Sequence, residues 1–441
     1  MQGVLEKSSR GSLLEKVFQL SKHNTNVRTE MTAGVTTFMT MGYVLIVQSN
    51  MMADAGMDSG AVTTVTALLA GVFTLIMGLY ANLPFALAPA MGSNAFFAYT
   101  LVAGGMVTWQ EGLGMVFVSG IIFLGLTLLG LREMIVKFIP KNVKIAIGSA
   151  VGFYITMLGF KSAQFMSITE GSLSIGNFAN PTTQLGLIGL ALTVILMANK
   201  VKGGLLIAMI GTTLIGIPMG ITTLPKTLVS LPPSIAPIAF KLNILSVLKL
   251  SFIPLIFTFF VGDFFSTLGT VLGVSAKAGL LDEKGDLPGI EKPFLVDAIA
   301  TVVGALLGST VVTTFIESAA GVEEGGRTGL TSVSTALCFL LTLFITPLVI
   351  MIPSVATAPA LIIIGLMMLS GMKDLDYEDF TNSFPAFVTI IVTAYTESIA
   401  NGISAGIISF AFTKIVAGRW KELHWGILLL CIPLVIYFIT L

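Results

Sequence analysis

The chain has 441 residues, of which 55% are hydrophobic and 10% charged, and its 23 basic residues balance its 23 acidic ones. Soluble domains carry about 25% charged residues, so this composition excludes an ordinary soluble protein and indicates an integral membrane protein. A net charge near zero argues against a nucleic-acid partner, because such proteins bind phosphates through an excess of basic residues. The apolar stretches are continuous and of helix length, which favours spanning helices over the alternating strands of a barrel.

The first 29 residues form a polar tail without a continuous apolar core, so they lack the apolar region of a signal peptide. The tail is rich in Lys and Arg, and the positive-inside rule therefore places it in the cytoplasm. We expect a multi-pass protein of the cell membrane, embedded in the lipid bilayer, with a cytoplasmic N-terminus.

Fourteen apolar segments follow in chain order. In the first half they cover residues 30–49, 60–80, 84–106, 111–131, 142–162, 184–199 and 203–219. In the second half they cover residues 250–275, 294–308, 311–325, 329–352, 357–373, 384–417 and 424–440. Basic residues follow segments four, six and eight, in agreement with a cytoplasmic start, whereas Lys226, Lys241, Arg419 and Lys421 are exceptions. The element at 384–417 is broken near Glu397 and is either a kinked helix or a re-entrant pair, and the second alternative moves the C-terminus across the membrane.

An internal repeat relates the two halves of the chain. An offset of 223 residues aligns an apolar stretch of the first half with one of the second, and it carries Thr40 onto Asp263 and Asn94 onto Glu317. Seven helices in each half make the repeat inverted in the membrane. This architecture is typical of secondary transporters, whose binding sites lie near the bilayer midplane.

The third and tenth segments each open with residues that disfavour a helix. In the third, Pro89 and Gly92 come just before Asn94, and in the tenth a β-branched run precedes Glu317 and Ser318. We expect a short extended piece followed by a half-helix in each segment. Irregular backbone at this depth is tolerated only where protein or a cavity surrounds it. The free N–H groups and positive dipole ends of two such half-helices suit a binding site.

Two carboxylates stand alone inside apolar segments. Asp263 is the only charged residue between Lys249 and Lys277, and Glu317 is likewise alone in its block. A charge at this depth costs about 2.5–3.5 kcal/mol on insertion scales and usually marks a substrate or ion path. Since no Lys or Arg lies at comparable depth to neutralise Asp263, we interpret both as site residues. The alternative is a structural carboxylate that caps a broken helix or pairs with a buried cation.

Neutral polar residues complete the candidate site. The amide of Asn94 both donates and accepts hydrogen bonds, which suits a planar heterocycle, although capping of the half-helix is an alternative. Thr40 and Ser318 are further substrate-binding candidates, and Glu397 lies either on the pathway or at an interface. The sequence contains no metal-ligand cluster, nucleophile motif or phosphate loop, so we expect neither an enzyme nor a cofactor.

Four stretches carry a resemblance to a known family. They are GVTTFMTMGYVL (34–45), MGSNAFFAYT (91–100), FVGDFFSTLGT (260–270) and TTFIESAAGVEEGGRTGLT (313–331). On these motifs the chain resembles the AzgA-like adenine/guanine/hypoxanthine permeases of the nucleobase–ascorbate transporter superfamily. The resemblance implies fourteen segments in two inverted repeats, with a core domain that moves against a gate domain. It also implies that a purine binds between the half-helices and that Asn94, Asp263 and Glu317 contact it. Relatives often place a histidine near the eighth-segment carboxylate, and this chain has none there.

These observations and the resemblance predict a purine nucleobase permease that works as a proton symporter, by an elevator-like movement of the core against the gate. The expected domains are a tail at 1–29, core parts at 30–135 and 246–354, and gate parts at 136–245 and 355–441. Asp263 and Glu317 are the candidates for carrying the proton, and Phe38, Phe96 or Phe264 for stacking on the purine. A pyrimidine or anion transporter, an uncoupled facilitator and a membrane receptor are the alternatives. The sequence does not determine which purine is preferred or whether the protein forms a homodimer.

Overall fold

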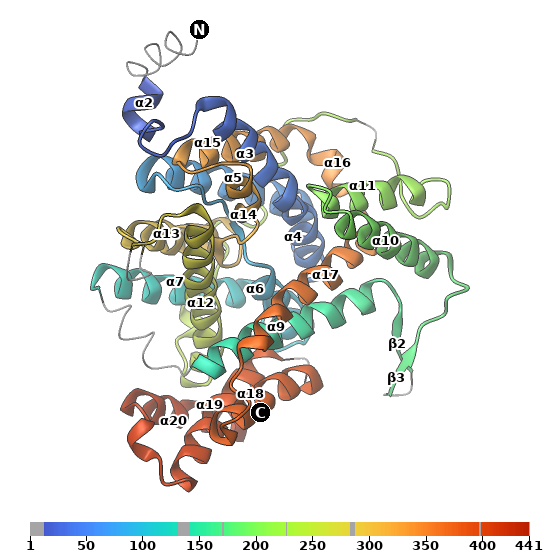
Figure 1. The fold of residues 1–441 in the computed structure, drawn as a ribbon. Coiled ribbons are helices and arrows are strands. Elements are labelled where there is room, and N and C mark those ends of the chain that lie inside the picture. Colours follow the sequence, from blue (N-terminus) through green and yellow to red (C-terminus); the bar gives the residue numbers. More distant parts are fainter. Residues whose placement is uncertain are drawn as a thin grey trace.

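The computed structural model describes residues 13–130, 141–169, 172–225, 227–282, 287–396 and 398–440, and Glu397 lies outside these ranges. Helices dominate the described chain (Figure 1). Nine helices within the described ranges are long and apolar enough to cross a membrane. The prediction of an all-α, multi-pass membrane protein is confirmed, while the exact count of fourteen spans stays a prediction.

The first half contains one three-residue strand, β1, among its helices, and a short hairpin of β2 and β3. Its elements are α2 (Leu13–Phe18), α3 (Val27–Met41), α4 (Tyr43–Asp54), α5 (Ser59–Ile76), the π-helix η1 (Met77–Ala81), β1 (Leu87–Pro89), α6 (Met91–Ala95), the π-helix η2 (Phe96–Ala103), α7 (Trp109–Leu128), α9 (Lys141–Ser162), β2 (Met166–Thr169), β3 (Ser172–Ile175), α10 (Pro181–Ala198) and α11 (Gly204–Gly216).

The second half repeats the alternation of long helices with one short strand. Its elements are the 3₁₀ turns η3 (Leu245–Val247) and η4 (Leu250–Phe252), α12 (Ile253–Ala278), α13 (Glu291–Leu307), β4 (Val312–Thr314), α14 (Ser318–Glu323), α15 (Gly329–Thr342), η5 (Leu343–Ile345), α16 (Thr346–Ile350), α17 (Ser354–Leu369), η6 (Ser370–Asp374), α18 (Phe380–Thr396), α19 (Ile399–Val416), η7 (Trp420–Glu422) and α20 (Trp425–Thr440).

The predicted extended pieces before the half-helices are present, and they pair with each other. Strand β1 precedes α6 and strand β4 precedes α14, and the two strands run antiparallel with Ala88 opposite Thr313. Each strand is only three residues long, so most of its backbone groups need partners from elsewhere. The pairing therefore joins the two halves of the chain at the point where both helices are interrupted.

Two threonines make equivalent hydrogen bonds to the first residues of β1 and β4, as expected for an internal repeat. The hydroxyl of Thr74 on α5 bonds both the N–H and the C=O of Leu87, at 2.9 and 3.3 Å. The hydroxyl of Thr301 on α13 bonds both groups of Val312 in the same way, at 3.1 Å each. Leu87 and Val312 are the first residues of their strands and lie 225 positions apart. At the strands the repeat offset is thus 225 rather than the 223 expected from sequence.

The broken element predicted at 384–417 is a pair of antiparallel helices, α18 and α19. Gly402 lies against Thr393 and Gly406 against Thr389, and the Thr413 hydroxyl donates to the Thr381 carbonyl at 3.3 Å. Both helices have 17 or 18 residues, enough for about 26 Å at 1.5 Å per residue. The alternative of one kinked helix is therefore excluded, and α20 is an additional helix that packs on α19.

One end of this pair lies beside the start of α9. The side chain of Asn142 donates to the carbonyl of Asp376 at 3.0 Å and accepts from its N–H at 3.2 Å. Arg419 binds Asp379 at this same end. Arg419 and the start of α9 therefore lie at the same end of this helix pair.

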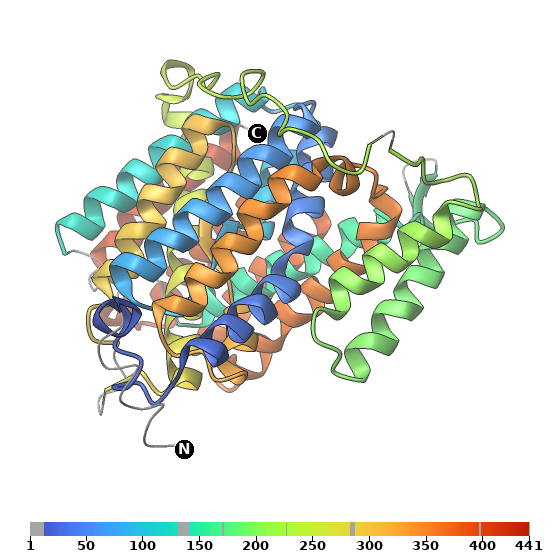
Figure 2. The same cartoon turned by 90° about the horizontal axis from the view of Figure 1, so that it is seen from above.

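The helices form two groups that meet along α9, α12 and α17. Helices α3, α5 and α15 pack together, as do α7, α12 and α13, whereas α9 packs along α17 and α18. Figure 2 shows α10 and α11 side by side on one flank of the molecule. The expected division of the chain into a core and a gate stays a prediction.

Candidate functional site

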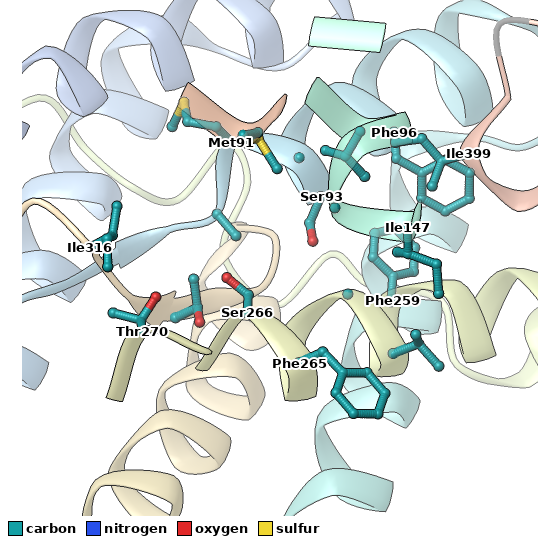
Figure 3. A pocket seen from close by; sticks show the side chains of 18 of the residues that line it. Met91, Ser93, Phe96, Ile147, Phe259, Phe265, Ser266, Thr270, Ile316 and Ile399 are labelled. Atoms are coloured by element: carbon teal, nitrogen blue, oxygen red, sulfur yellow. The ribbon is translucent and has the colours of Figure 1, made fainter. Parts of the chain in front are cut away.

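A cavity of about 270 Å³ lies where the two groups of helices meet. One wall comes from α4, α6, α12 and the segment from β4 to α14, and the other comes from α9, α17 and α19. Small-molecule sites start at about 300 Å³, so this volume suits a single small ring system. Figure 3 shows the hydroxyls of Ser93 and Ser266 in this cavity together with the side chains of Phe96, Ile147 and Phe259.

Glu317 lines this cavity and is held by a tyrosine of the first repeat. It occupies the position just before α14, where the irregular backbone between β4 and the half-helix ends. The Tyr43 hydroxyl donates to Oε1 of Glu317 at 2.6 Å. Tyr43 is the first residue of α4, directly after the break at Gly42 that separates α4 from α3. The break thus directs a hydroxyl at the carboxylate.

Asp263 does not line the cavity but lies behind it, between α12 and α13. Its side chain is buried, and its Oδ2 accepts a hydrogen bond from the Thr301 hydroxyl at 3.0 Å. Its carboxyl group interacts with that of Asp297, which is also fully buried. Sequence reasoning missed Asp297, although it is a charged residue inside the predicted segment 294–308 and therefore carried a signal.

Threonines connect the two carboxyl groups to strand β4. The Thr267 hydroxyl bonds Oδ2 of Asp297 at 2.8 Å and the Thr313 hydroxyl at 2.7 Å. The N–H of Thr314 donates to Oδ1 of Asp297 at 2.9 Å. Thr313 and Thr314 themselves line the cavity. Strand β4 therefore lies between this pair of carboxyl groups and the cavity.

The three neutral candidates form contacts within the protein. The Asn94 side chain is buried, donates to the Pro89 carbonyl at 3.4 Å and accepts from the Thr310 hydroxyl. The Thr40 hydroxyl donates to carbonyls of its own helix and, at 3.5 Å, to that of Glu317. None of Asn94, Thr40 and Ser318 is among the residues that line the cavity.

The hydroxyl of Ser318 instead accepts from the N–H of Ala86, at 3.0 Å, just before strand β1. Ser318 thus ties the start of the second half-helix to the first strand, and Asn94 ties the first half-helix to the segment before β4. This reciprocal arrangement supports the site's backbone. The expectation that these three side chains bind substrate stays a prediction.

Three phenylalanines supply aromatic surface to the cavity. Phe96, Phe259 and Phe265 line it, and the rings of Phe96 and Phe259 are 5.0 Å apart between centroids. Of the three stacking candidates named from sequence, Phe38 packs on Phe339, and Phe264 packs within a cluster of phenylalanines from α7, α12 and α13. Of those three, only Phe96 reaches the cavity.

A basic residue also reaches the cavity, contrary to expectation. Lys144, one turn into α9, lines the cavity, and its Nζ lies 4.9 Å from the centroid of the Phe265 ring. From the sequence, Lys144 counts among the basic residues that follow segment four, although it falls inside the predicted segment 142–162. The cavity therefore contains one carboxylate and one ammonium group from its described residues, rather than carboxylates alone.

Comparisons with known proteins show the family of the chain. A family model described as a permease family matches residues 28–405. The chain is 44% identical to a putative permease of Methanocaldococcus jannaschii, over 97% of this chain and 98% of the relative. It is 40% identical to the adenine permease AdeP of Escherichia coli K12, over 96% and 95%. It is 37% identical to the guanine/hypoxanthine permease PbuO of Bacillus subtilis, over 96% and 98%.

Solved structures share the fold at low sequence identity. The transmembrane domain of a cyanobacterial bicarbonate transporter, BicA, superposes with a TM-score of 0.60 at 17% identity, over 86% of this chain and 97% of that one. The structure of SLC26A9 gives 0.62 at 12%, over 89% and 65%. These likenesses concern the fold alone. The family model and the full-length relatives identify a transporter rather than an enzyme, and the chain belongs to this permease family.

Proposed function

We propose that the protein imports purine nucleobases, namely adenine, guanine or hypoxanthine, across the cell membrane. Relatives named as adenine and as guanine/hypoxanthine permeases align over nearly the whole chain. The observation that carries the proposal is the carboxylate of Glu317 in a cavity of about 270 Å³ with aromatic walls. A carboxylate accepts hydrogen bonds from ring N–H groups, and the phenylalanines offer faces on which a planar base stacks.

In this proposal Glu317 binds the purine directly and Tyr43 positions it. Ser93 and Ser266, whose hydroxyls lie in the cavity, provide further hydrogen bonds. Asn94, Thr40 and Ser318 support the interrupted backbone, and their direct contact with substrate is the weaker alternative. Asp263 and Glu317 are the carboxylates proposed to take up a co-transported proton.

We further propose an elevator-like movement of a core (30–135 and 246–354) against a gate (136–245 and 355–441). The cavity has one wall from each of these parts, so sliding one wall along the other moves a bound base across the membrane barrier. The N-terminal tail (1–29) is placed in the cytoplasm by its basic residues. An uncoupled facilitator on the same fold is the alternative.

Uptake of radiolabelled hypoxanthine by cells that lack their own purine permeases tests the proposal. Glu317→Gln and Asp263→Asn are expected to abolish uptake while the protein still reaches the membrane. Glu291→Gln, at the exposed start of α13, is the control and leaves uptake unchanged. Near-normal uptake by both site variants contradicts the site, and accumulation that a protonophore does not reduce contradicts proton symport.

A further inference from the structure

The two walls of the cavity differ in polarity. The wall from α4, α6, α12 and the β4–α14 segment contributes Glu317 and the hydroxyls of Ser93 and Ser266. The wall from α9, α17 and α19 is apolar, through residues such as Ile147, with the exception of Lys144. Among the described lining residues, Lys144 is thus the single charged group that this second wall presents to a ligand.

The position of the Lys144 ammonium group is constrained by its neighbour across the cavity. Its Nζ lies over the ring of Phe265 on α12, 4.9 Å from the centroid. A cation is attracted to an aromatic face, so this contact keeps the ammonium group at the junction of the two walls. Lys144 and Glu317 therefore offer one donor group and one acceptor group to the same small ligand.

This pair of charges distinguishes between purines. Hypoxanthine and guanine carry an N1–H donor beside the acceptors O6 and N7, whereas adenine carries an acceptor at N1 and an amino donor at position 6. A carboxylate only accepts and an ammonium group only donates. Lysine recognises the O6/N7 edge of guanine, and a well-placed contact of this type gives about 1–3 kcal/mol of discrimination.

We infer that Lys144 selects 6-oxopurines over adenine by donating to O6 and N7 while Glu317 accepts from N1–H. The inference rests on the proposed transport of purines and adds the substrate class. Adenine places its amino group against the ammonium and its bare N1 against the carboxylate, so the contacts at position 6 and at N1 are lost and only the contact at N7 remains. Since Lys144 lies on α9 and Glu317 precedes α14, a bound oxopurine also joins the two walls.

Competition for uptake of radiolabelled hypoxanthine tests the inference. Unlabelled hypoxanthine and guanine are expected to compete at least about tenfold better than adenine in the wild type. Lys144→Gln is expected to remove most of this preference, whereas Lys144→Arg, which keeps the donors and the charge, retains it. Lys161→Gln, on the same helix but outside the cavity lining, is the matched control and leaves the preference unchanged.

A series of analogues on the wild-type protein keeps the test decisive if the Gln variant fails to fold. 7-Deazahypoxanthine lacks the N7 acceptor, and unsubstituted purine lacks both O6 and the N1–H donor, so each is expected to compete several-fold less well than hypoxanthine. Equal competition by both analogues, a wild-type preference for adenine, or an unchanged preference in Lys144→Gln overturns the inference. If no purine competes at all, the proposed function itself fails, which is a different result.

Discussion

The carboxyl groups of Asp263 and Asp297 interact with each other between α12 and α13, one strand away from the cavity. Oδ1 of Asp263 is buried and lacks a hydrogen-bond donor among the described groups, whereas Asp297 accepts from Thr267 and Thr314. Two ionised carboxylates in contact repel each other. A single proton between them satisfies the Asp263 oxygen, which makes the pair a candidate for holding the proton of the proposed symport.

If the proposed proton symport operates through this pair, replacement of Asp297 by Asn is expected to separate proton coupling from substrate binding. The new amide group donates permanently to Oδ1 of Asp263, so the pair no longer gains and loses a proton. We expect purine binding and exchange of purine across the membrane to persist, while accumulation driven by a proton gradient is lost. Proteoliposomes with and without an imposed gradient measure both quantities. Asp374→Asn, at an exposed position, is the control, and intact gradient-driven accumulation in Asp297→Asn contradicts the prediction.

Removal of the Tyr43 hydroxyl is expected to weaken purine binding about tenfold. The hydroxyl donates to Glu317 at 2.6 Å, and a hydrogen bond to a charged group contributes about 1.5–3 kcal/mol. Tyr43→Phe keeps the ring in its buried place but leaves the carboxylate free to turn away from the ligand. Binding to purified protein, measured by calorimetry, checks this expectation.

Tyr99→Phe is the matched control for this measurement. The Tyr99 hydroxyl donates to Asp54 at 2.8 Å, and neither residue lines the cavity. An affinity in Tyr43→Phe as high as that in Tyr99→Phe means that Glu317 does not need its tyrosine partner to bind the purine.

Much of the fold could be predicted from the sequence, because apolar runs of helix length report directly on spans. The positions of Pro89 and of the β-branched run before Glu317 also predicted the two extended pieces, and β1 and β4 confirm them. The pairing of those strands could not be predicted, since it brings together residues more than 200 positions apart.

The site residues were harder to predict, because a charged residue near the end of an apolar segment lies either at the membrane surface or between the helices. Lys144 and Asp297 fall near the starts of their predicted segments, where a charge usually lies at the membrane surface. The structure instead directs Lys144 into the cavity and buries Asp297 against Asp263. The hydrophobic pattern reports how deep a residue lies in a segment, whereas contact between helices decides which way its side chain points.

Glu30 is expected to stabilise the fold rather than bind substrate. It is fully buried and accepts from the N–H groups of Arg327, Thr328 and Thr331, and from the Thr331 hydroxyl at 2.6 Å. These donors stand at the start of α15, so Glu30 caps that helix from α3. A glutamine offers one accepting oxygen in place of two, and we expect Glu30→Gln to destabilise the protein by about 1–3 kcal/mol.

Thermal unfolding in detergent measures this effect. Glu378→Gln, at an exposed position before α18, is the control, because surface substitutions usually change stability by less than about 0.5 kcal/mol. The same unfolding temperature in both variants shows that α15 does not depend on the Glu30 carboxylate.

The close approach of α18 and α19 depends on Gly402. A methyl group at this position overlaps the side chain of Thr393 and the backbone of Thr389. Small residues allow helices to approach closely in membranes, and overpacking typically costs about 1–3 kcal/mol. Gly402→Ala is therefore expected to lower the unfolding temperature. Gly125→Ala on α7, where a methyl group meets no other atom, is expected to leave it unchanged or raise it.

Asp379, Arg419 and Lys414 form an ion cluster at one end of the α18–α19 pair. This cluster makes the stability of the fold depend on pH, and the direction of the change follows from the pKa of Asp379. A hydrogen bond from Thr381, together with Arg419 and Lys414, lowers the pKa of the Asp379 carboxyl group to about 2, below the value of about 3.9 in an unfolded chain. Its stabilisation is therefore fully present above pH 4 and is lost as the pH falls through about 2.

Comparison of the wild type with Asp379→Asn tests this pH dependence. We expect the difference in unfolding temperature between the two proteins to stay constant from pH 8 to pH 5, because Asp379 remains ionised in both the folded and the unfolded state over that range. The difference is expected to shrink between pH 4 and pH 3, where the carboxyl group of the unfolded chain takes up its proton and the folded one does not. A difference that already disappears between pH 7 and pH 5 means that the cluster does not hold Asp379 ionised as the contacts with Thr381 and Arg419 require.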